Sequence, residues 1–408
     1  MTASPLDRVL AATTPLLSRA VHRLLVEVAS RIRIGQLEVR FPDGSARVFG
    51  QPDAAERAVL VLHDDRAMRR ILLGGETGAG EAYMDGLWSS PDLPALLRLA
   101  GRNRAALGLS SGWLSVPQRA QLAIAHRMRH NSPANARRNI AAHYDLGNDF
   151  YRLWLDETLT YSSAVFETED QSLEDAQRAK YRRLAEGAAL RAGDEVLEIG
   201  SGWGGFALYA AGELGCHVTS ITLSAEQQRL ATERVRAAGL QDRVTIELRD
   251  YRDVRGTYDA IVSIEMLEAV GADYLDTYFQ ASAEALRPGG RVSLQSITVP
   301  EAPNRRRGGG TNWIQTYIFP GGHLPSLGEI GRALRGTGLV VSAVRDIAPH
   351  YVRTLQAWRA AFHARRPEVL ALGFDETFIR MWDFYLALSE AGFANGITQD
   401  LQIVLEQR

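Results

Sequence analysis

Hydrophobic residues recur at helical spacing near the start of the chain and then give way to a strand pattern. Leu, Val and Ile fall on one face of a helix across residues 16–32, and residues 35–50 form two short strand-like runs around a Pro-Asp-Gly turn at 42–44. Further on, Asp92 follows Ser and Pro residues at a typical helix start. The pattern therefore predicts a small mixed α+β domain over residues 1–105.

A different pattern runs from residue 140 to residue 408. Helical stretches alternate with apolar, strand-like runs at residues 195–200, 216–223, 244–250, 258–264 and 291–299. This alternation is typical of a mostly parallel sheet wound with helices. The sequence therefore predicts an α/β, Rossmann-like domain over residues 140–408, joined to the first domain by a basic linker or helix at 106–139.

Size and composition fit a protein of two or three folded domains. The chain has 408 residues, of which 46% are hydrophobic and 23% are charged, as in ordinary globular proteins. Its apolar runs end well short of the ~18 residues that a membrane-spanning helix needs, and its first residues show no signal-peptide pattern. We therefore expect a cytoplasmic protein. The single cysteine, Cys216, excludes an internal disulfide and a thiolate metal site, and we expect no metal.

Charge is distributed unevenly, although the formal net charge is only −2. No Asp or Glu lies between Asp92 and Asp145, whereas the arginines of this segment are Arg98, Arg102, Arg104, Arg119, Arg127, Arg129, Arg137 and Arg138. Such a basic block suits an anionic partner, either a phospholipid headgroup layer or a nucleic acid. The alternative is a solvated helical face that binds nothing.

A glycine-rich turn follows the run at 195–200 and contains Gly200, Gly202 and Gly204. Glycines allow a sharp turn and let a ligand lie against the start of a helix. The spacing is G-x-G-x-G, which differs from the dinucleotide fingerprint G-x-G-x-x-G. Because Glu198 precedes the turn and no Lys is present there to meet a phosphate, the pattern favours a nucleoside without phosphate. It resembles the first motif of S-adenosylmethionine-dependent methyltransferases, and a purely structural glycine turn is the alternative.

Ligands of such sheets bind at the carboxyl ends of the strands, where the strand order reverses. We therefore expect residues at or just past the ends of the next two strands to line the ribose and the adenine. These residues are Thr222, Gln227, Asp250 and Tyr251. Together with Glu198 and the glycines of the turn, they form the predicted cofactor site.

Longer motifs indicate one family. The segment AAHYDLGNDFYRLWLDETLTYSSAVF at 141–166 is similar to the cyclopropane-fatty-acyl-phospholipid synthases and the related mycolic acid methyltransferases. The resemblance continues through VLEIGSGWGG, SITLSAEQ, SIEMLEAVG, YIFPGGHLPS and PHYVRTLQAW and covers residues 140–408 densely. The amino-terminal domain resembles the lipid-associated domain of bacterial phospholipid-acting members, including residues 80–93. The resemblance implies that S-adenosylmethionine is the cosubstrate and that Tyr161 and Ser162 also contact it.

The reaction of this family needs a base. When a cis alkene attacks the methyl group of a sulfonium, positive charge develops on the neighbouring carbon, and a base must then take a proton. The resemblance implies a bicarbonate ion in this role, held by a Cys, a Glu, a His, an Ile backbone group and a Tyr. Glu268, Ile297 and Tyr351 match three of these ligands, whereas Ser163 and Gln295 replace the Cys and the His. Glu268 is then itself a candidate for the base or for stabilising the cation.

The resemblance implies one-carbon transfer from S-adenosylmethionine to the cis double bond of unsaturated phospholipid acyl chains, as in cyclopropane fatty acid synthases, at the inner face of the cell membrane. Because Ser163 and Gln295 alter the bicarbonate site, a methylene or methyl-branched chain is the alternative product. A non-catalytic lipid-binding protein is a further alternative, and a homodimer is compatible with each. Nucleic-acid modification is disfavoured, since the fourth strand continues as YDAIVSIEMLE without an Asn-Pro or Asp-Pro pair to grip a flipped base.

Overall fold

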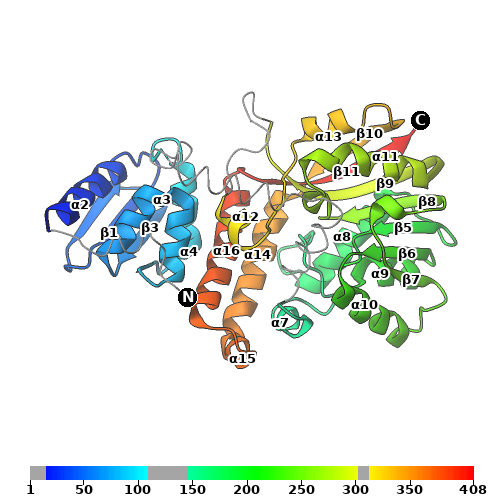
Figure 1. Cartoon of the computed structure of the whole chain (residues 1–408), viewed down its shortest axis with the longest axis horizontal. Coiled ribbons are helices and arrows are strands. Elements are labelled where there is room, and N and C mark those ends of the chain that lie inside the picture. The colour runs from blue at the N-terminus through cyan, green and yellow to red at the C-terminus, as the bar shows by residue number, and fades with distance from the viewer. Residues whose placement is uncertain (1–14, 109–145, 302–311) are drawn as a thin grey trace. The chain divides into compact units, whose positions relative to one another are not determined.

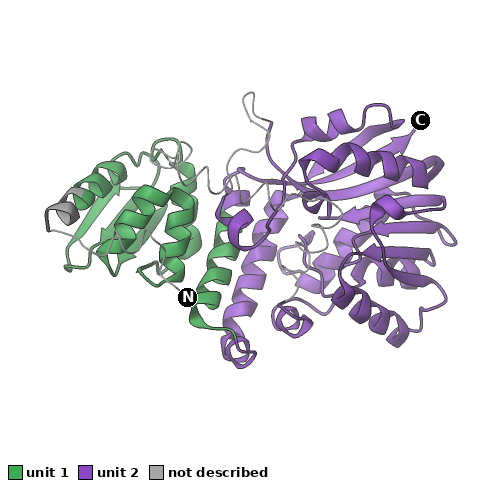
Figure 2. Ribbon diagram, in the orientation of Figure 1, with its two compact units in different colours: residues 1–120, 374–391 green, residues 121–373, 392–408 purple. Residues whose placement is uncertain are grey.

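The chain folds into two compact units (Figures 1 and 2). The computed structural model describes residues 15–108, 146–301 and 312–408. The first unit comprises residues 1–120 and 374–391, and the second comprises residues 121–373 and 392–408. The first unit thus includes a late segment of the chain that no sequence pattern assigned to it. The sequence-based division at residues 105 and 139 stays a prediction, because most of the linker between them lies outside the described residues.

The first unit is built on a four-stranded sheet with the strand order β2-β1-β3-β4. Its strands are β1 (Gln36–Arg40), β2 (Ala46–Gly50), β3 (Arg57–Leu62) and β4 (Trp88–Ser89). β1 and β2 form the predicted antiparallel hairpin, β1 pairs with β3 in parallel, and β3 pairs with β4 antiparallel. The prediction of a small mixed α+β domain is confirmed.

Helices complete the first unit. They are α2 (Pro15–Ala29), α3 (Asp65–Met84) and α4 (Leu93–Arg102). The predicted start of α4 is confirmed, because the side chain of Asp92 accepts a 2.9 Å hydrogen bond from a backbone N–H of the first turn. The late segment contributes most of α16 (Glu376–Ala394). Its hydrogen bonds to the rest of the unit include one that Tyr83 donates to Asp383 at 2.6 Å and one that Arg98 donates to Glu390 at 2.9 Å.

The second unit is built on a seven-stranded sheet with the order β10-β11-β9-β8-β5-β6-β7. Its strands are β5 (Glu195–Ile199), β6 (His217–Thr222), β7 (Val244–Leu248), β8 (Tyr258–Ile264), β9 (Leu286–Thr298), β10 (Leu339–Asp346) and β11 (Gln399–Gln407). The strands β5 to β9 are parallel, and β11 runs antiparallel to both β9 and β10. The five predicted strands and the mostly parallel α/β sheet are confirmed, whereas β10 and β11 were not predicted.

Helices cover both faces of this sheet (Figure 1). The described α-helices of the second unit are α7 (Asn148–Arg152), α8 (Leu173–Gly187), α9 (Gly205–Glu213), α10 (Ala225–Ala237), α11 (Leu275–Ala285), α12 (Trp313–Tyr317), α13 (Leu327–Ala333), α14 (Ala348–Ala364) and α15 (Arg366–Ala371). Short 3₁₀ turns are η1 (Tyr251–Asp253), η2 (Leu267–Ala269) and η3 (Ala272–Tyr274). Successive strand residues alternate between two cores: Val196 packs with α8 and α9, and Leu197 packs with α11 and α13. With both faces covered, the strand ends are left to form a binding site.

The basic block lies only partly within the described residues. Arg98 and Arg102 form ion pairs with Glu390 and Glu56, each with an N–O distance of 2.9 Å. Their positive charge is therefore compensated locally, which reduces the basic surface that the sequence predicts. The arginines that lie outside the described residues are Arg119, Arg127, Arg129, Arg137 and Arg138. Among the helices that are described, none is long and apolar enough to cross a bilayer.

Candidate active site

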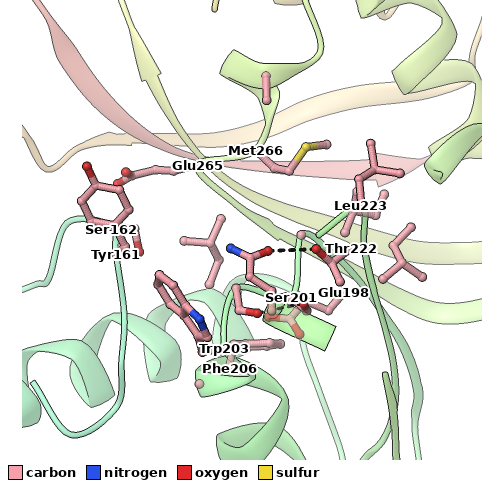
Figure 3. Close-up of a pocket in the computed structure, with 18 of the residues that line it drawn as sticks. Tyr161, Ser162, Glu198, Ser201, Trp203, Phe206, Thr222, Leu223, Glu265 and Met266 are labelled. Carbon is pink, nitrogen blue, oxygen red and sulfur yellow. Dashed lines mark hydrogen bonds between the residues drawn. The ribbon is translucent and has the colours of Figure 1, made fainter. Parts of the chain in front are cut away.

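A cavity lies at the carboxyl ends of the parallel strands of the second unit (Figure 3). Its lining comes from residues 198–203 at the end of β5, residues 221–223 at the end of β6, the start of η1 after β7, residues 264–266 at the end of β8, and the segment 159–162. The strand order reverses at this point, because β6 and β8 flank β5 on opposite sides. The cavity therefore occupies the switch point where ligands of such sheets bind.

Three glycines shape the turn between β5 and α9. Gly200, Gly202 and Gly204 have φ angles of 97°, 48° and 83°, in the left-handed region that favours glycine. Gly202 lines the cavity, and a Cβ atom added to it would meet no protein atom within 4 Å. Such an atom would occupy space that is open to a ligand. Gly204 does not line the cavity, and a Cβ atom there would instead lie 3.3 Å from the Cβ atom of Ala231 on α10.

Glu198 brings a buried carboxyl group to the cavity. Its side chain lines the cavity, and only 2% of the residue is exposed. The hydroxyl of Ser220 donates a hydrogen bond to it. Burial raises the pKa of Glu198 to about 8, although the Ser220 hydrogen bond and the positive charge of Lys180 act in the opposite direction. Carboxyl oxygens at this position are suited to accept hydrogen bonds from ribose hydroxyl groups.

The remaining predicted nucleoside contacts differ in their placement. Thr222, labelled in Figure 3, donates from Oγ1 to Gln227 Oε1 at 2.8 Å. Both residues line the cavity, as does Tyr251. Asp250 does not line it, because Oδ1 of Asp250 accepts hydrogen bonds from the backbone N–H and the Nε atom of Arg252, at 3.0 and 2.8 Å. The structure thus places Asp250 as the cap of η1, and neither Asp250 nor Gly204 belongs to the cavity wall.

Aromatic rings surround one wall of the cavity. The ring centroid of Tyr161 lies 5.5, 5.4 and 5.3 Å from the centroids of Tyr151, Trp154 and Trp358. Trp203, in the glycine turn, lies 4.8 Å from Tyr151. Tyr161 and Trp203 themselves line the cavity (Figure 3). Because the faces of aromatic rings attract cations, this wall suits a sulfonium group.

Three sequence-predicted residues converge on Glu265, which the sequence analysis did not select. Oε1 of Glu265 accepts hydrogen bonds from the backbone N–H of Ser163 and from Nε2 of Gln295, both at 2.8 Å. Oε2 accepts a hydrogen bond from the hydroxyl of Tyr351 at 2.7 Å. Glu265 directly follows β8 and lines the cavity. A carboxylate at the end of a parallel strand beside the switch point is the signal that could have identified it.

Glu268 and Ile297 also meet, but not at the cavity. The backbone N–H of Ile297 and the hydroxyl of Ser296, the latter at 3.0 Å, donate to Oε1 of Glu268. Neither Glu268 nor Ile297 is among the cavity-lining residues. Burial and then the negative charge of Glu265 raise the pKa of Glu268 to about 8. At pH 7 this carboxyl group is therefore largely protonated.

A buried lysine and a third carboxyl group complete this cluster. Lys180 is fully buried and donates from Nζ to Ser162 Oγ at 2.7 Å. Burial lowers the pKa of Lys180 to about 8, against the effect of the surrounding carboxylates, of which Glu265 is the largest contributor. Asp400 on β11 accepts a 3.0 Å hydrogen bond from Gln295. Burial, followed by the charges of Glu265 and Glu268, raises the pKa of Asp400 well above its ordinary value. The three carboxyl groups are therefore not all ionised at neutral pH.

The sheet topology, the glycine turn and the position of the cavity define an α/β S-adenosylmethionine-dependent methyltransferase. Glu198, the open space at Gly202 and the aromatic wall fit the ribose, the nucleoside and the sulfonium of that cosubstrate. The chain belongs to the mycolic acid cyclopropane synthetase family, whose family model matches residues 131–403. It is thus an enzyme that uses S-adenosylmethionine, as the sequence predicted.

Relatives in this family are similar over most of the chain. The tuberculostearic acid methyltransferase of Mycobacterium tuberculosis is 44% identical over 391 residues, which cover 92% of this chain and 88% of that protein. The cyclopropane-fatty-acyl-phospholipid synthase of Escherichia coli is 36% identical over 343 residues, covering 83% and 85%. A solved mycolic acid cyclopropane synthase complexed with SAH and CTAB has a TM-score of 0.62 at 31% identity, covering 66% of this chain and 98% of that chain. The predicted family and fold are confirmed.

Proposed function

We propose that the enzyme transfers one carbon from S-adenosylmethionine to the cis double bond of an unsaturated phospholipid acyl chain. The names of the two relatives, a fatty-acyl-phospholipid synthase and a tuberculostearic acid methyltransferase, support an acyl chain as the substrate. The observation that carries the proposal is the placement of a carboxylate, Glu265, in the wall of the cofactor cavity. Methyl transfer to an oxygen or nitrogen nucleophile needs no proton from carbon, whereas addition to an alkene does.

The movement of electrons in this reaction explains why a base is needed. The π electrons of the alkene form the new bond to the methyl carbon, and the electrons of the broken S–C bond stay on sulfur. The neighbouring chain carbon is left as a cation. If a base then takes a proton from the transferred methyl group, the C–H electrons close a cyclopropane ring. The aromatic wall around Tyr161 and Trp203 is suited to stabilise the positive charge in the sulfonium and in the cation.

The same cation also leads to branched products. A hydride shift from the methyl-bearing carbon to the cationic carbon, followed by proton loss from the methyl group, gives a methylene branch. Proton loss from the chain gives a methyl branch beside a retained double bond. Two observations support a branched product as the alternative to cyclopropane. Ser163 and Gln295 stand at the positions of the family's Cys and His, and a relative that is 44% identical is named a tuberculostearic acid methyltransferase.

We propose a location at the inner face of the cell membrane, where the acyl chains of phospholipids are reached from the cytoplasm. The arginines between Asp92 and Asp145 support this location, since basic residues near an anionic bilayer surface contribute about 1 kcal/mol each. Arg98 and Arg102 contribute less to this argument, because each is paired with a carboxylate. The non-catalytic alternative is not retained, because the chain is a methyltransferase by family and by fold.

Isotope-labelled cosubstrate tests the reaction and its product together. The enzyme is incubated with S-adenosylmethionine carrying a CD₃ group and with vesicles of dioleoyl phosphatidylglycerol, and the fatty acid methyl esters are analysed by mass spectrometry. A ring or a methylene group retains two deuterium atoms, whereas a methyl branch retains three. Mild hydrogenation then distinguishes a methylene-branched chain from a cyclopropane chain, because of these two products only the methylene-branched chain takes up hydrogen. Vesicles of saturated lipid are the control, and no label in any unsaturated lipid would overturn the proposed function.

A further inference from the structure

We propose that Glu265 is the group that accepts the proton in this reaction, so that the base is a side chain of the enzyme and not a bound bicarbonate ion. The inference rests on the proposed function, because only addition to an alkene requires a proton to leave carbon. It concerns a residue outside the set that the family resemblance selects, which contains Glu268 as its carboxylate.

The placement of Glu265 fits this role. Its carboxylate lies in the cavity wall at the end of β8, and Figure 3 shows it on the side of the cavity that carries Tyr161 and Ser162, away from Thr222 and Leu223. Thr222, a nucleoside contact predicted from the sequence, lies on the opposite side (Figure 3). Glu265 therefore borders the part of the cavity where the sulfonium end of the cosubstrate meets the aromatic wall.

The hydrogen bonds of Glu265 use the donors that an outside anion would need. The backbone N–H of Ser163 and the hydroxyl of Tyr351 each have one proton to donate, and both donate it to Glu265. Gln295 divides its amide protons between Glu265 and Asp400. The remaining implied ligand, the N–H of Ile297, donates to Glu268. The described residues thus form a complete binding site for one carboxylate, and Glu265 fills it, so bicarbonate does not fit here.

Negative charge in the cluster is best placed on Glu265. Glu265 accepts three hydrogen bonds within the described part of the chain, and the ammonium group of Lys180 is close enough to oppose the rise in its pKa that burial causes. Asp400 has one oxygen, Oδ1, that is buried without a partner among the described residues. Glu268 has an unpartnered buried oxygen as well, Oε2. Since an unpartnered buried oxygen favours the protonated form, Glu265 is the carboxylate that remains available as a base.

Burial also makes Glu265 a better base than an exposed carboxylate. The pKa of Glu265 is raised by burial, while its three hydrogen bonds and the charge of Lys180 keep this rise in check. General bases work best when their pKa lies near the working pH. The proton goes to a carboxylate oxygen of Glu265, and the electrons of the broken C–H bond form the new bond of the product, so that no further reactant is needed.

Substitution of Glu265 tests the proposal directly. Glu265→Gln keeps the shape of the side chain and removes its basicity, so turnover on dioleoyl phosphatidylglycerol vesicles should fall about 10²- to 10⁴-fold. The affinity for S-adenosylhomocysteine, measured by calorimetry, should stay within about twofold, since that ligand carries no proton to be removed. The matched control is Glu233→Gln, which changes an exposed glutamate on α10 and should leave both quantities unchanged.

Removal of the side chain gives a second readout. Glu265 has a φ of 49°, which glycine adopts easily, so Glu265→Gly should fold and leave the three donors facing an empty space. Added formate or bicarbonate should then restore turnover in a saturable manner. The same anions should not rescue Glu265→Gln, because its amide still fills the site.

The wild-type enzyme provides a test that needs no variant. In buffer stripped of carbon dioxide and bicarbonate, its turnover should stay unchanged. Dependence on added bicarbonate, or full turnover by folded Glu265→Gln, would overturn this inference while leaving the proposed function standing. If the wild-type enzyme labels no unsaturated lipid, the proposed function itself falls, and this inference falls with it.

Discussion

The hydroxyl of Tyr351 on α14 donates a 2.7 Å hydrogen bond to Oε2 of Glu265 at the end of β8, linking residues 86 positions apart in the chain. This bond lowers the pKa of Glu265, whereas burial raises it. Tyr351 is therefore a positioning residue that favours the ionised carboxylate and fixes its orientation. Its position on a helix that packs against β11 explains why the sheet and α14 must both be formed before this site exists.

Tyr351→Phe should reduce turnover at pH 7 by about tenfold or more, since a hydrogen bond to a charged group contributes about 1.5–3 kcal/mol. The loss should shrink as the pH rises, because the pKa of Glu265 is higher without this donor and more alkaline conditions are needed to ionise it. Lys180, Glu268 and Asp400 face the same cluster and also titrate. The pH–rate profile of the variant is therefore compared with that of the wild type, and superimposable profiles would contradict the assignment.

Gly202→Val should weaken cofactor binding. Its φ of 48° disfavours a β-branched residue, and its added side chain would occupy the open space of the cavity. Calorimetry with S-adenosylhomocysteine should show at least a tenfold loss of affinity, which corresponds to about 1.4 kcal/mol of binding free energy. Gly212→Ala is the matched control in the same region, because a Cβ atom there would lie at an ordinary 3.5 Å from Leu240. Unchanged affinity in folded Gly202→Val would remove the glycine turn from the cofactor site.

Glu268→Gln distinguishes the two candidate bases. If Glu268 were the base, which the sequence analysis considered because Ser163 and Gln295 alter the bicarbonate site, turnover at pH 7 should fall about 10²- to 10⁴-fold. The structure predicts a loss of less than about tenfold, because a carboxyl group whose pKa is about 8 is mostly protonated at pH 7 and a neutral amide resembles it. Turnover of this variant and of Glu265→Gln is measured side by side on the same vesicles. A larger loss in Glu268→Gln than in Glu265→Gln would return the role to Glu268.

The thermal stability of the protein should fall as the pH rises from about 6 to 8. Glu198 and Glu268 have a pKa of about 8 in the folded chain, compared with 4.5 for an unperturbed glutamate. The folded state therefore binds more protons than the unfolded state in this range, and this contribution to stability is present in acid and lost as the pH rises through about 8. Scanning fluorimetry should show a smaller decline for Glu268→Gln, whereas Glu233→Gln should follow the wild type. A flat profile in the wild type would contradict these raised pKa values.

Vesicle binding should require anionic headgroups and weaken with salt, since attraction between surface charges is screened over about 8 Å at physiological ionic strength. Joint substitution of Arg127, Arg129, Arg137 and Arg138 should weaken binding, at about 1 kcal/mol for each residue near the surface, and leave cofactor affinity unchanged. Arg102→Gln is the comparison, because Arg102 already pairs with Glu56 and should contribute less. Equal sedimentation with neutral and anionic vesicles across salt concentrations would contradict a membrane role for this block.

The strands of the second unit could be predicted where their residues are apolar and lie between turn signals. β5 to β9 meet that condition, and each was found. β11 does not meet it, because polar or charged residues make up much of QDLQIVLEQ. β10 does begin with an apolar run, LVVSAV, after two glycines, and this strand was overlooked in the sequence analysis. Their place in the sheet depends on pairing with β9, which is a long-range relationship that no local pattern reveals.

The cofactor side of the site was more predictable than the base side. Glu198, Gly202 and Thr222 follow from the rule that strand ends meet at one edge of a sheet, and all three line the cavity. Asp250 fits the same rule but turns away to Arg252, because side-chain direction after a strand depends on the local turn. Glu265 also satisfies this rule, but the family resemblance directed the selection to Glu268. Its hydrogen bonds to Ser163, Gln295 and Tyr351 could not be predicted, because residue spacing does not reveal its left-handed backbone or these long-range contacts.

Lys180 is the one lysine of the sequence, and it is fully buried. An amine-selective reagent can therefore reach this side chain only when the interior of the second unit opens. Because no other lysine reacts, the rate at which Lys180 is modified reports that opening event, once peptide mapping has separated it from reaction at the α-amino group. A cosubstrate bound in the cavity beside Ser162 should slow this labelling. The labelling rate of Lys180 therefore measures how strongly a ligand stabilises the closed interior of the methyltransferase unit.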